Sequence, residues 1–191
     1  MRMDLKRIAV FCGSSAGQDS VYIENAKQLG EAMAANNKTL VYGGAQVGCM
    51  GAVANAVLDQ GGQAIGVIPQ KLMDVEIAHE HLTELHVVET MHERKAKMAD
   101  LADGFVALPG GAGTLEEWFE VFTWAQLGYH DKPIALLNVN GFYDPLIQML
   151  DHTIDEGFMK KEYRDMIIVA EEPAALIDKM NRYEASYVVK W

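Results

Sequence analysis

The stretch that decides the fold is FVALPGGAGTLEEWFEVFTWAQ, residues 105–126. It begins with four apolar residues, Phe105–Leu108, between a glycine and a proline, and such a run is typical of a buried parallel strand. Gly110, Gly111 and Gly113 form a turn in which no side chain blocks the approach of a ligand, and we expect a helix from Thr114. The unpaired N–H groups at a helix start, together with the helix dipole, favour binding of a phosphate. The stretch therefore predicts a strand, an anion-binding turn and a helix in succession.

Two adjacent acids, Glu116 and Glu117, follow this turn, in the expected first turn of the helix. Acids are common at that position because they suit the helix dipole. Beside an anion site, however, they repel a phosphate unless part of the ligand lies between the charges. This tension points to a function for at least one acid, and helical periodicity does not decide which of the two faces the ligand.

The rest of the chain alternates between strand-like and helix-like patterns. The expected strands are residues 8–11, 39–42, 64–68, 85–88, 105–108, 133–138 and 166–169. The expected helices are residues 20–37, 50–60 and 143–156, with others after Met91, Thr114 and Pro173, while residues 70–84 give no clear pattern. Glycine-rich turns follow several strands, which predicts an α/β fold with a doubly wound parallel sheet. We expect a single Rossmann-like nucleotide-binding domain over residues 1–191, with the ligand beyond the carboxyl ends of the strands.

Several classes of function are disfavoured by what the sequence lacks. The glycines after the first strand, Gly13-Ser-Ser-Ala-Gly17, do not match the dinucleotide fingerprint, and no lysine follows a glycine run as in a P-loop. The net charge of −11 disfavours nucleic acid polymers, because their binding depends on many lysine and arginine contacts to phosphates. His79 and His81 are a weak metal pair, so we expect no metal and no cofactor.

The composition also bears on compartment. No run of about 18 apolar residues and no signal-peptide pattern occurs, so we expect a cytoplasmic protein without membrane association. The two cysteines, Cys12 and Cys49, are expected to be buried, reduced thiols.

The helix that begins near Met91 carries a cation on its apolar side. At about 100° per residue, Met91, Met98 and Leu101 share one stripe, and Arg94 falls inside it. An inward-pointing arginine beside glycine turns suits a phosphate or carboxylate, which it contacts through two N–H groups. Lys95 lies at the edge of the stripe, where ligand contact and a surface position are equally compatible with the pattern.

Two motifs now indicate a family. Residues 109–117, PGGAGTLEE, resemble the PGGxGTxxE signature of the Lonely Guy family, and residues 91–95, MHERK, resemble that family's second motif. The likeness runs from Cys12 to the segment around Phe158. Family members hydrolyse the N-glycosidic bond of nucleoside 5′-monophosphates, typically those of cytokinin ribosides, and release the base and ribose 5-phosphate. The resemblance therefore implies a hydrolase acting on a small nucleotide.

The resemblance also implies roles for particular residues. It makes Arg94 and Glu117 catalytic, with Glu116 as the alternative acid. The implied substrate-binding residues are Glu76, Lys95, Gly110, Gly111, Gly113, Thr114, Glu116 and Thr123. From sequence alone, Glu76 and Thr123 fit ordinary surface or capping positions equally well.

Family members are at least dimers, and one helix here has the composition of an interface. The expected helix after Thr114 is apolar on more than one face, with Trp118, Phe119, Val121 and Trp124. Such a helix is usually buried on both sides. We expect a homodimer that uses this helix, with the active site near the interface.

Two other functions stay open at this point. One is a general nucleosidase acting on AMP or other purine nucleotides, and another is a non-catalytic carrier of a nucleotide or cofactor with the same fold. A carrier needs the glycine turn but not Arg94 together with Glu117. The family also carries the label of lysine decarboxylase, but the sequence does not support that activity, because no lysine stands out as an anchor for pyridoxal phosphate.

Overall fold

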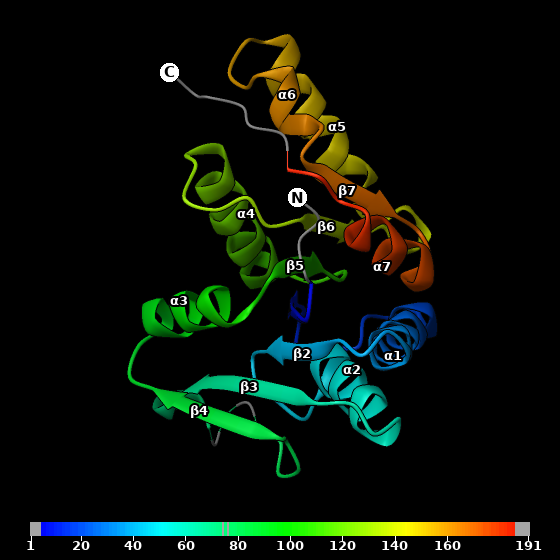
Figure 1. The fold of residues 1–191 in the computed structure, drawn as a ribbon, viewed down its shortest axis with the longest axis vertical. Helices are drawn as coiled ribbons and strands as arrows, with labels where there is room; N and C mark the ends of the chain where they lie inside the picture. The colour runs from blue at the N-terminus through cyan, green and yellow to red at the C-terminus, as the bar shows by residue number, and fades with distance from the viewer. Residues whose placement is uncertain (1–4, 74, 76, 186–191) are drawn as a thin grey trace.

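The computed structural model describes residues 5–73, 75 and 77–185, and its centre is a seven-stranded sheet (Figure 1). All strand pairs are parallel, in the order β4-β3-β2-β1-β5-β6-β7. The strands are β1 (Arg7–Phe11), β2 (Thr39–Tyr42), β3 (Ala64–Pro69), β4 (Glu84–Val88), β5 (Gly104–Ala107), β6 (Ile134–Leu137) and β7 (Ile167–Ala170). The predicted doubly wound parallel α/β fold is confirmed.

Helices cover both faces of the sheet (Figure 1). One face carries α1 (Ser20–Ala35), α2 (Gly48–Asp59) and α7 (Pro173–Asn181), and the other carries α3 (Met91–Leu101), α4 (Ala112–Gln126), α5 (Asp144–Asp155) and the short α6 (Lys161–Arg164). Two short 3-10 turns, η1 (Gln70–Leu72) and η2 (Val139–Gly141), follow β3 and β6.

The central strand divides the core into two layers. Ile8 and Val10 of β1 pack with the α1 and α2 side, while Ala9 and Phe11 pack with the α3 and α4 side. This follows from the period of two residues in a strand, and because both faces are covered, β1 is apolar at nearly every position.

Most element boundaries agree with the sequence expectations to within two residues, but the start of α4 is a correction. The helix begins at Ala112 rather than Thr114, with Gly111 as its N-cap. Gly111 has an extended backbone and the next residue, Ala112, is already helical, so the helix starts within the glycine turn rather than after it. Glu116 and Glu117 consequently lie in the second turn of α4 rather than in the first.

Other expectations can be checked at the level of single residues. Both cysteines are buried and free, as predicted. Phe119 is not a core residue of α4, because 37% of its surface is exposed, whereas Trp118 and Phe122 are buried. Among the described helices, none has the length and apolar character needed to cross a membrane.

The sheet order creates a switch point beside β1. The chain leaves β1 toward β2 on one side and, after β4, returns to pair β5 with the other side of β1. Loops from neighbouring strands therefore diverge above the carboxyl end of β1, which is where ligands bind in folds of this kind.

Candidate active site

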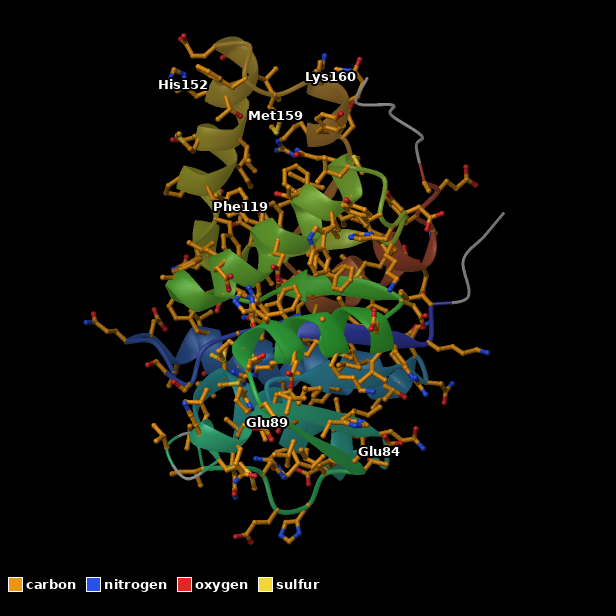
Figure 2. All side chains as sticks on the ribbon, turned by 90° about the vertical axis from the view of Figure 1, so that its left-hand side faces the viewer. Glu84, Glu89, Phe119, His152, Met159 and Lys160 are labelled. Atoms are coloured by element: carbon orange, nitrogen blue, oxygen red, sulfur yellow. The ribbon has the colours of Figure 1, made fainter. Side chains whose placement is uncertain are left out.

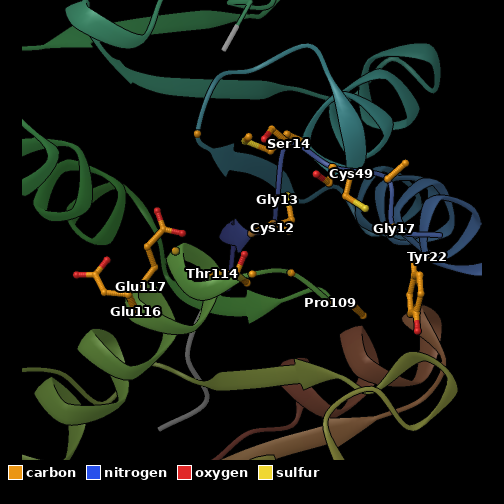
Figure 3. Close-up of a pocket in the computed structure, with 18 of the residues that line it drawn as sticks. Cys12, Gly13, Ser14, Gly17, Tyr22, Cys49, Pro109, Thr114, Glu116 and Glu117 are labelled. Carbon is orange, nitrogen blue, oxygen red and sulfur yellow. The ribbon is translucent and has the colours of Figure 1, made fainter. Parts of the chain in front are cut away.

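A cavity of about 530 Å³ lies at this switch point (Figure 3). It is formed by the segments that follow β1, β2 and β5, by the cavity-facing sides of α3 and α4, and by the turn after β6. Its lining residues are Val10, Cys12–Gly17, Tyr22, Gly43, Cys49, Met50, Met91, Arg94, Met98, Pro109, Gly110, Gly111, Gly113, Thr114, Glu116, Glu117 and Phe142. The predicted anion turn, arginine and both predicted acids are thus brought together in one cavity.

The anion turn has free space where side chains are missing. A Cβ atom added to Gly111 or Gly113 would meet nothing within 4 Å, and neither residue has a positive φ. Gly110 differs, because a Cβ there would lie 2.2 Å from the Thr114 hydroxyl oxygen. Protein packing therefore requires glycine at 110 only, whereas glycine at 111 and 113 leaves room for a ligand.

The start of α4 also offers hydrogen-bond donors to such a ligand. Gly111 is the N-cap and no side chain caps the helix. At this end of the helix, the Leu115 N–H donates to the Gly111 carbonyl at 3.2 Å. The amide groups before Leu115 belong to the first turn of a helix, whose N–H groups lack intrahelical acceptors and attract anions.

Arg94 is held at the floor of the cavity by main-chain carbonyls. Its side chain is on α3, which begins after Thr90, whose hydroxyl caps the helix by accepting from the Glu93 N–H. Arg94 is only 5% exposed; its Nε donates to the Val67 carbonyl at 2.9 Å and its Nη2 to the Gly43 carbonyl at 2.6 Å. These contacts join α3 to the ends of β2 and β3 and fix the direction of the guanidinium.

Gly43 is part of the same arrangement. A Cβ atom at this position would lie 2.3 Å from the Arg94 Nη2 atom. The glycine after β2 is therefore required by the arginine that packs on it, which is a physical reason for a glycine that the sequence showed only as part of a turn.

The two neighbouring acids of α4 have different surroundings. Glu116 accepts a short hydrogen bond from the Lys95 ammonium group, which also contacts Glu120 at 3.2 Å. The Lys95 side chain is 9% exposed, and its hydrogen bond to Glu116 is the main cause that raises its pKa. Glu117 is half-buried on the cavity side. Lys95 thus pairs with Glu116 and Glu120 beside the cavity.

Two thiols also line the cavity, but neither has the character of a nucleophile. Burial raises the pKa of Cys12 well above its ordinary value, with further contributions from Cys49 and Glu117, while Arg94 opposes them. Burial also raises the pKa of Cys49. Because the thiolate is the reactive form, both cysteines stay protonated and inert. The same charges show that Cys12, Glu117 and Arg94 are electrostatic neighbours.

One side of the cavity is formed by two aromatic residues, Tyr22 and Phe142, that the sequence did not predict. Tyr22 comes from the first turn of α1 and Phe142 from the turn after β6, and their ring centroids are 5.9 Å apart in an edge-to-face contact. The two residues are 120 positions apart in the printed sequence, so only the fold brings them together. Neither belongs to a motif that marked it beforehand.

Comparisons with known proteins agree with the geometry. Residues 50–180 match the model of a family described as "Possible lysine decarboxylase". A probable cytokinin riboside 5′-monophosphate phosphoribohydrolase of Oryza sativa subsp. japonica is 49% identical over 182 residues, covering 95% of this chain and 75% of the relative. The cytokinin riboside 5′-monophosphate phosphoribohydrolase of Rhodococcoides fascians is 51% identical over 168 residues, covering 87% and 85%. This chain belongs to the Lonely Guy family.

Solved structures with other names share the fold of this Lonely Guy protein. The molybdenum cofactor binding protein of Rippkaea orientalis aligns with a TM-score of 0.73 over 94% of this chain and 98% of that chain, at 22% identity. The molybdenum cofactor carrier protein of Chlamydomonas reinhardtii aligns with a TM-score of 0.71 over 93% and 97%, at 21% identity. At such identities the likeness establishes a shared architecture only.

The description of the Lonely Guy family model as a lysine decarboxylase is not reflected in the cavity. A pyridoxal phosphate enzyme needs a lysine amine to anchor the cofactor. None of the described lining residues is a lysine. The nearest candidate by sequence, Lys95, is engaged with Glu116 and Glu120.

Two described residues that the Lonely Guy resemblance pointed to, Lys95 and Thr123, are not on the cavity lining. The Lys95 ammonium group donates to Glu116, which does line the cavity. Thr123 is exposed on α4 and is not among the lining residues. Glu76 lies outside the described residues. A substrate contact by Thr123 within one protomer is therefore not supported by its position.

His79 and His130 form contacts within the fold. The His79 ring contacts the Asn55 side-chain oxygen at 3.0 Å and accepts from the His81 N–H, and His130 contacts the Val121 carbonyl at 2.8 Å. Within the described part of the chain, no group of three or more histidine, cysteine or acidic residues is arranged to hold a metal.

Proposed function

We propose that this Lonely Guy protein hydrolyses the N-glycosidic bond of cytokinin riboside 5′-monophosphates and releases the free base and ribose 5-phosphate. The names of relatives at about half identity support this activity. The structural observation that carries it is the convergence of an uncapped helix start, Arg94 and Glu117 on one cavity. A phosphate site next to a carboxylate suits a substrate with an anion at one end and developing positive charge at the other.

Binding energy from the phosphate positions the ribose. We place the 5′-phosphate on the N–H groups at the start of α4, where Gly111 and Gly113 leave space. Contacts to this non-reacting group hold the anomeric carbon against the catalytic groups, so part of the binding energy lowers the barrier of the chemical step.

Glu117 is the proposed catalytic carboxylate. Cleavage of the ribosyl C–N bond builds oxocarbenium character on the sugar, as in glycoside hydrolysis. A carboxylate stabilises this positive charge and orients the water that attacks the anomeric carbon. Glu116 is less suited, because its side chain is 57% exposed and directed to Lys95, whereas Glu117 is half-buried at the cavity.

Arg94 is the proposed nucleotide-orienting cation. Its guanidinium stays charged and does not serve as a proton donor to the departing base. The carbonyls of Gly43 and Val67 fix the direction of the guanidinium, so this group is already oriented before the substrate binds.

We also propose that the enzyme is a cytoplasmic homodimer. Reduced, buried thiols and a nucleotide substrate suit the cytoplasm. Phe119, Leu127 and Tyr129 of α4 and its following turn are 37%, 42% and 77% exposed, and Figure 2 views the face on which Phe119 lies. Exposed large apolar side chains on and beside one helix are typical of a contact with a second subunit.

A release assay tests the proposed activity. The protein is incubated with N6-isopentenyladenosine 5′-monophosphate, with AMP and with N6-isopentenyladenosine, and the free base is measured by chromatography. We expect rapid release from the prenylated monophosphate and almost none from the nucleoside, which has no group for the α4 site. Faster turnover of AMP would make the enzyme a general purine nucleotide nucleosidase. Turnover of the nucleoside at the same rate would contradict the phosphate site.

A further inference from the structure

We propose that Tyr22 and Phe142 form a rigid wall at the phosphate end of the cavity, and that this wall makes the enzyme select nucleoside monophosphates over diphosphates. The proposal rests on the function given above, in which the 5′-phosphate lies at the start of α4. It assigns a specificity role to two residues that neither motif of the family contains.

The wall and the catalytic acid lie on opposite sides of the anion turn. In Figure 3, Thr114 lies between Glu117 and Tyr22, and Pro109 lies toward Tyr22. Phe142 accompanies Tyr22, because their ring centroids are 5.9 Å apart. A ribose placed at Glu117 with its phosphate at the start of α4 therefore directs any further group on that phosphate toward the two aromatic rings.

Packing makes this wall rigid. Gly17 has a φ of +76°, and a Cβ there would lie 2.7 Å from the Tyr22 ring, so the ring packs directly on the glycine. Phe142 makes an edge-to-face contact with Tyr143 at 5.0 Å. Tyr143 is 1% exposed, and its hydroxyl donates to the Leu108 carbonyl, at the end of the strand that leads into the anion turn.

The turn that carries Phe142 is fixed from its other side as well. The Asn138 side chain accepts from the Tyr143 N–H at 2.7 Å and donates to the Asp144 carboxylate at 2.7 Å. Within this turn, Asn140 and Gly141 both have positive φ values, of 51° and 69°. The backbone is thereby bent so that Phe142 lines the cavity while Tyr143 is buried behind it.

Charge acts in the same direction as shape. Among the described lining residues, Arg94 is the single lysine or arginine, and it is bound to carbonyls at the ends of β2 and β3, away from Phe142. A second phosphate would place further negative charge against aromatic rings and backbone. Phe142 is 38% exposed, so this phosphate would be only partly desolvated, but no further lysine or arginine of the described lining would pair with it, and the net charge of −11 adds to the cost.

Substitution of Phe142 tests the proposal. Phe142→Ala removes the ring, and Phe142→Lys also supplies a cation. Phe158→Ala is the matched control, because Phe158 is 88% exposed and is not on the cavity lining. For each protein, kcat/KM is measured with N6-isopentenyladenosine 5′-monophosphate and with the corresponding 5′-diphosphate. The ratio of the two values does not depend on how much of a preparation is folded.

We expect wild type and Phe158→Ala to favour the monophosphate equally. Phe142→Ala should raise the diphosphate-to-monophosphate ratio by about tenfold, the scale on which one pocket contact discriminates substrates, and Phe142→Lys should raise it further. An unchanged ratio in both Phe142 variants overturns the proposal. It is also overturned if Phe142→Ala instead lowers kcat/KM for the prenylated monophosphate relative to AMP, because the ring then contacts the base.

Failure of the proposed function is distinguishable from failure of the wall. If wild type releases no base from any monophosphate, the function is wrong. Calorimetric titration with the same monophosphate and diphosphate then measures the ratio of their Kd values in wild type and in both Phe142 variants. The same tenfold change in ratio supports the wall, and its absence contradicts it.

Discussion

The Lys95 ammonium group lies against the carboxylate of Glu116, which is exposed, while the neighbouring Glu117 is half-buried at the cavity. Adjacent residues on a helix point about 100° apart, so two neighbouring acids rarely share one environment. The ion pair gives Glu116 a structural partner on α3. Glu117 is the acid that lies close enough to the buried Cys12 to raise the pKa of that thiol, and this position inside the cavity supports Glu117 as the catalytic acid, which helical periodicity alone did not decide.

Exchange of each acid for its amide separates their roles. Glu117→Gln keeps the shape and removes the charge, so we expect kcat to fall by about 100-fold or more, the scale for loss of one preorganised electrostatic group. Nucleotide Kd should be unchanged or lower, because repulsion of the phosphate is relieved. Glu116→Gln is the matched control, with a smaller loss in kcat. If Glu116→Gln shows the larger loss, the catalytic assignment passes to Glu116.

Substitution of Arg94 should affect both function and stability. Arg94 is buried and donates hydrogen bonds to two main-chain carbonyls. Leaving a buried acceptor without a donor costs about 1–3 kcal/mol, so Arg94→Ala should lower Tm as well as raising nucleotide Kd. Arg94→Lys keeps the charge but not the forked geometry, and should also lose kcat. Thermal melts and steady-state kinetics check this, and wild-type kinetics in Arg94→Lys would exclude the orienting role.

Gly113→Ala should stabilise the folded protein but weaken its binding of the nucleotide. The added Cβ meets no protein atom, and alanine in a helix is favoured over glycine by about 0.5–1 kcal/mol, so Tm should rise slightly. The methyl group nevertheless enters the space assigned to the phosphate, so KM should rise by about tenfold or more. Gly30→Ala in α1 provides the contrast, since its Cβ would lie 2.6 Å from the Val53 carbonyl and should lower Tm. An unchanged KM in Gly113→Ala would contradict the assignment of the phosphate to this turn.

The proposed dimer depends on the exposed face of α4. Phe119→Glu places a charge in an apolar contact, and we expect it to shift the protein toward monomers at micromolar concentration in analytical ultracentrifugation. The core should be unaffected, because Phe119 is already partly exposed in the single chain. A monomeric wild-type protein, or a dimer that withstands Phe119→Glu, would contradict an α4 interface.

His79 should make the protein less stable in acid. Burial, followed by the neighbouring His81, lowers the pKa of His79 below its ordinary value of 6.5, and Glu80 opposes this. The unfolded chain then binds a proton more readily than the folded chain, so stability present above about pH 6.5 is lost as the pH falls below it. The neutral ring also accepts from the His81 N–H and would lose this acceptor on protonation. Tm measured from pH 7.5 to 5.5 should fall less steeply for His79→Gln than for wild type, and equal slopes would show that His79 is not responsible.

Much of the fold was predictable because its signals are local. Strands buried on both faces appear as short apolar runs between glycines and prolines, as at Phe105–Leu108. Arg94 could be assigned to the inside of its helix by periodicity alone, and the structure confirms its burial. The family was also identified correctly, because two motifs at fixed separation are specific.

The features that were missed depend on contacts between distant segments. The start of α4 was placed two residues late because glycine carries no helix signal, although here it caps the helix. The pairing of Lys95 with Glu116 and Glu120 depends on how α3 packs against α4, which no single helix reveals. Tyr22 and Phe142 meet only because the loops after β1 and β6 converge above the sheet.

The central place of β1 has a consequence for synthesis on the ribosome. The first strand made pairs with β2 soon after it emerges, but its other edge waits until β5, about a hundred residues later, is available. During that interval a nascent chain exposes an apolar strand edge, which is a risk for aggregation. The cavity is completed later still, when Phe142 has been translated. A chain that ends between β4 and β5 therefore contains α3 with Arg94 at most. It lacks the segments after β5 and β6 that complete the nucleotide cavity.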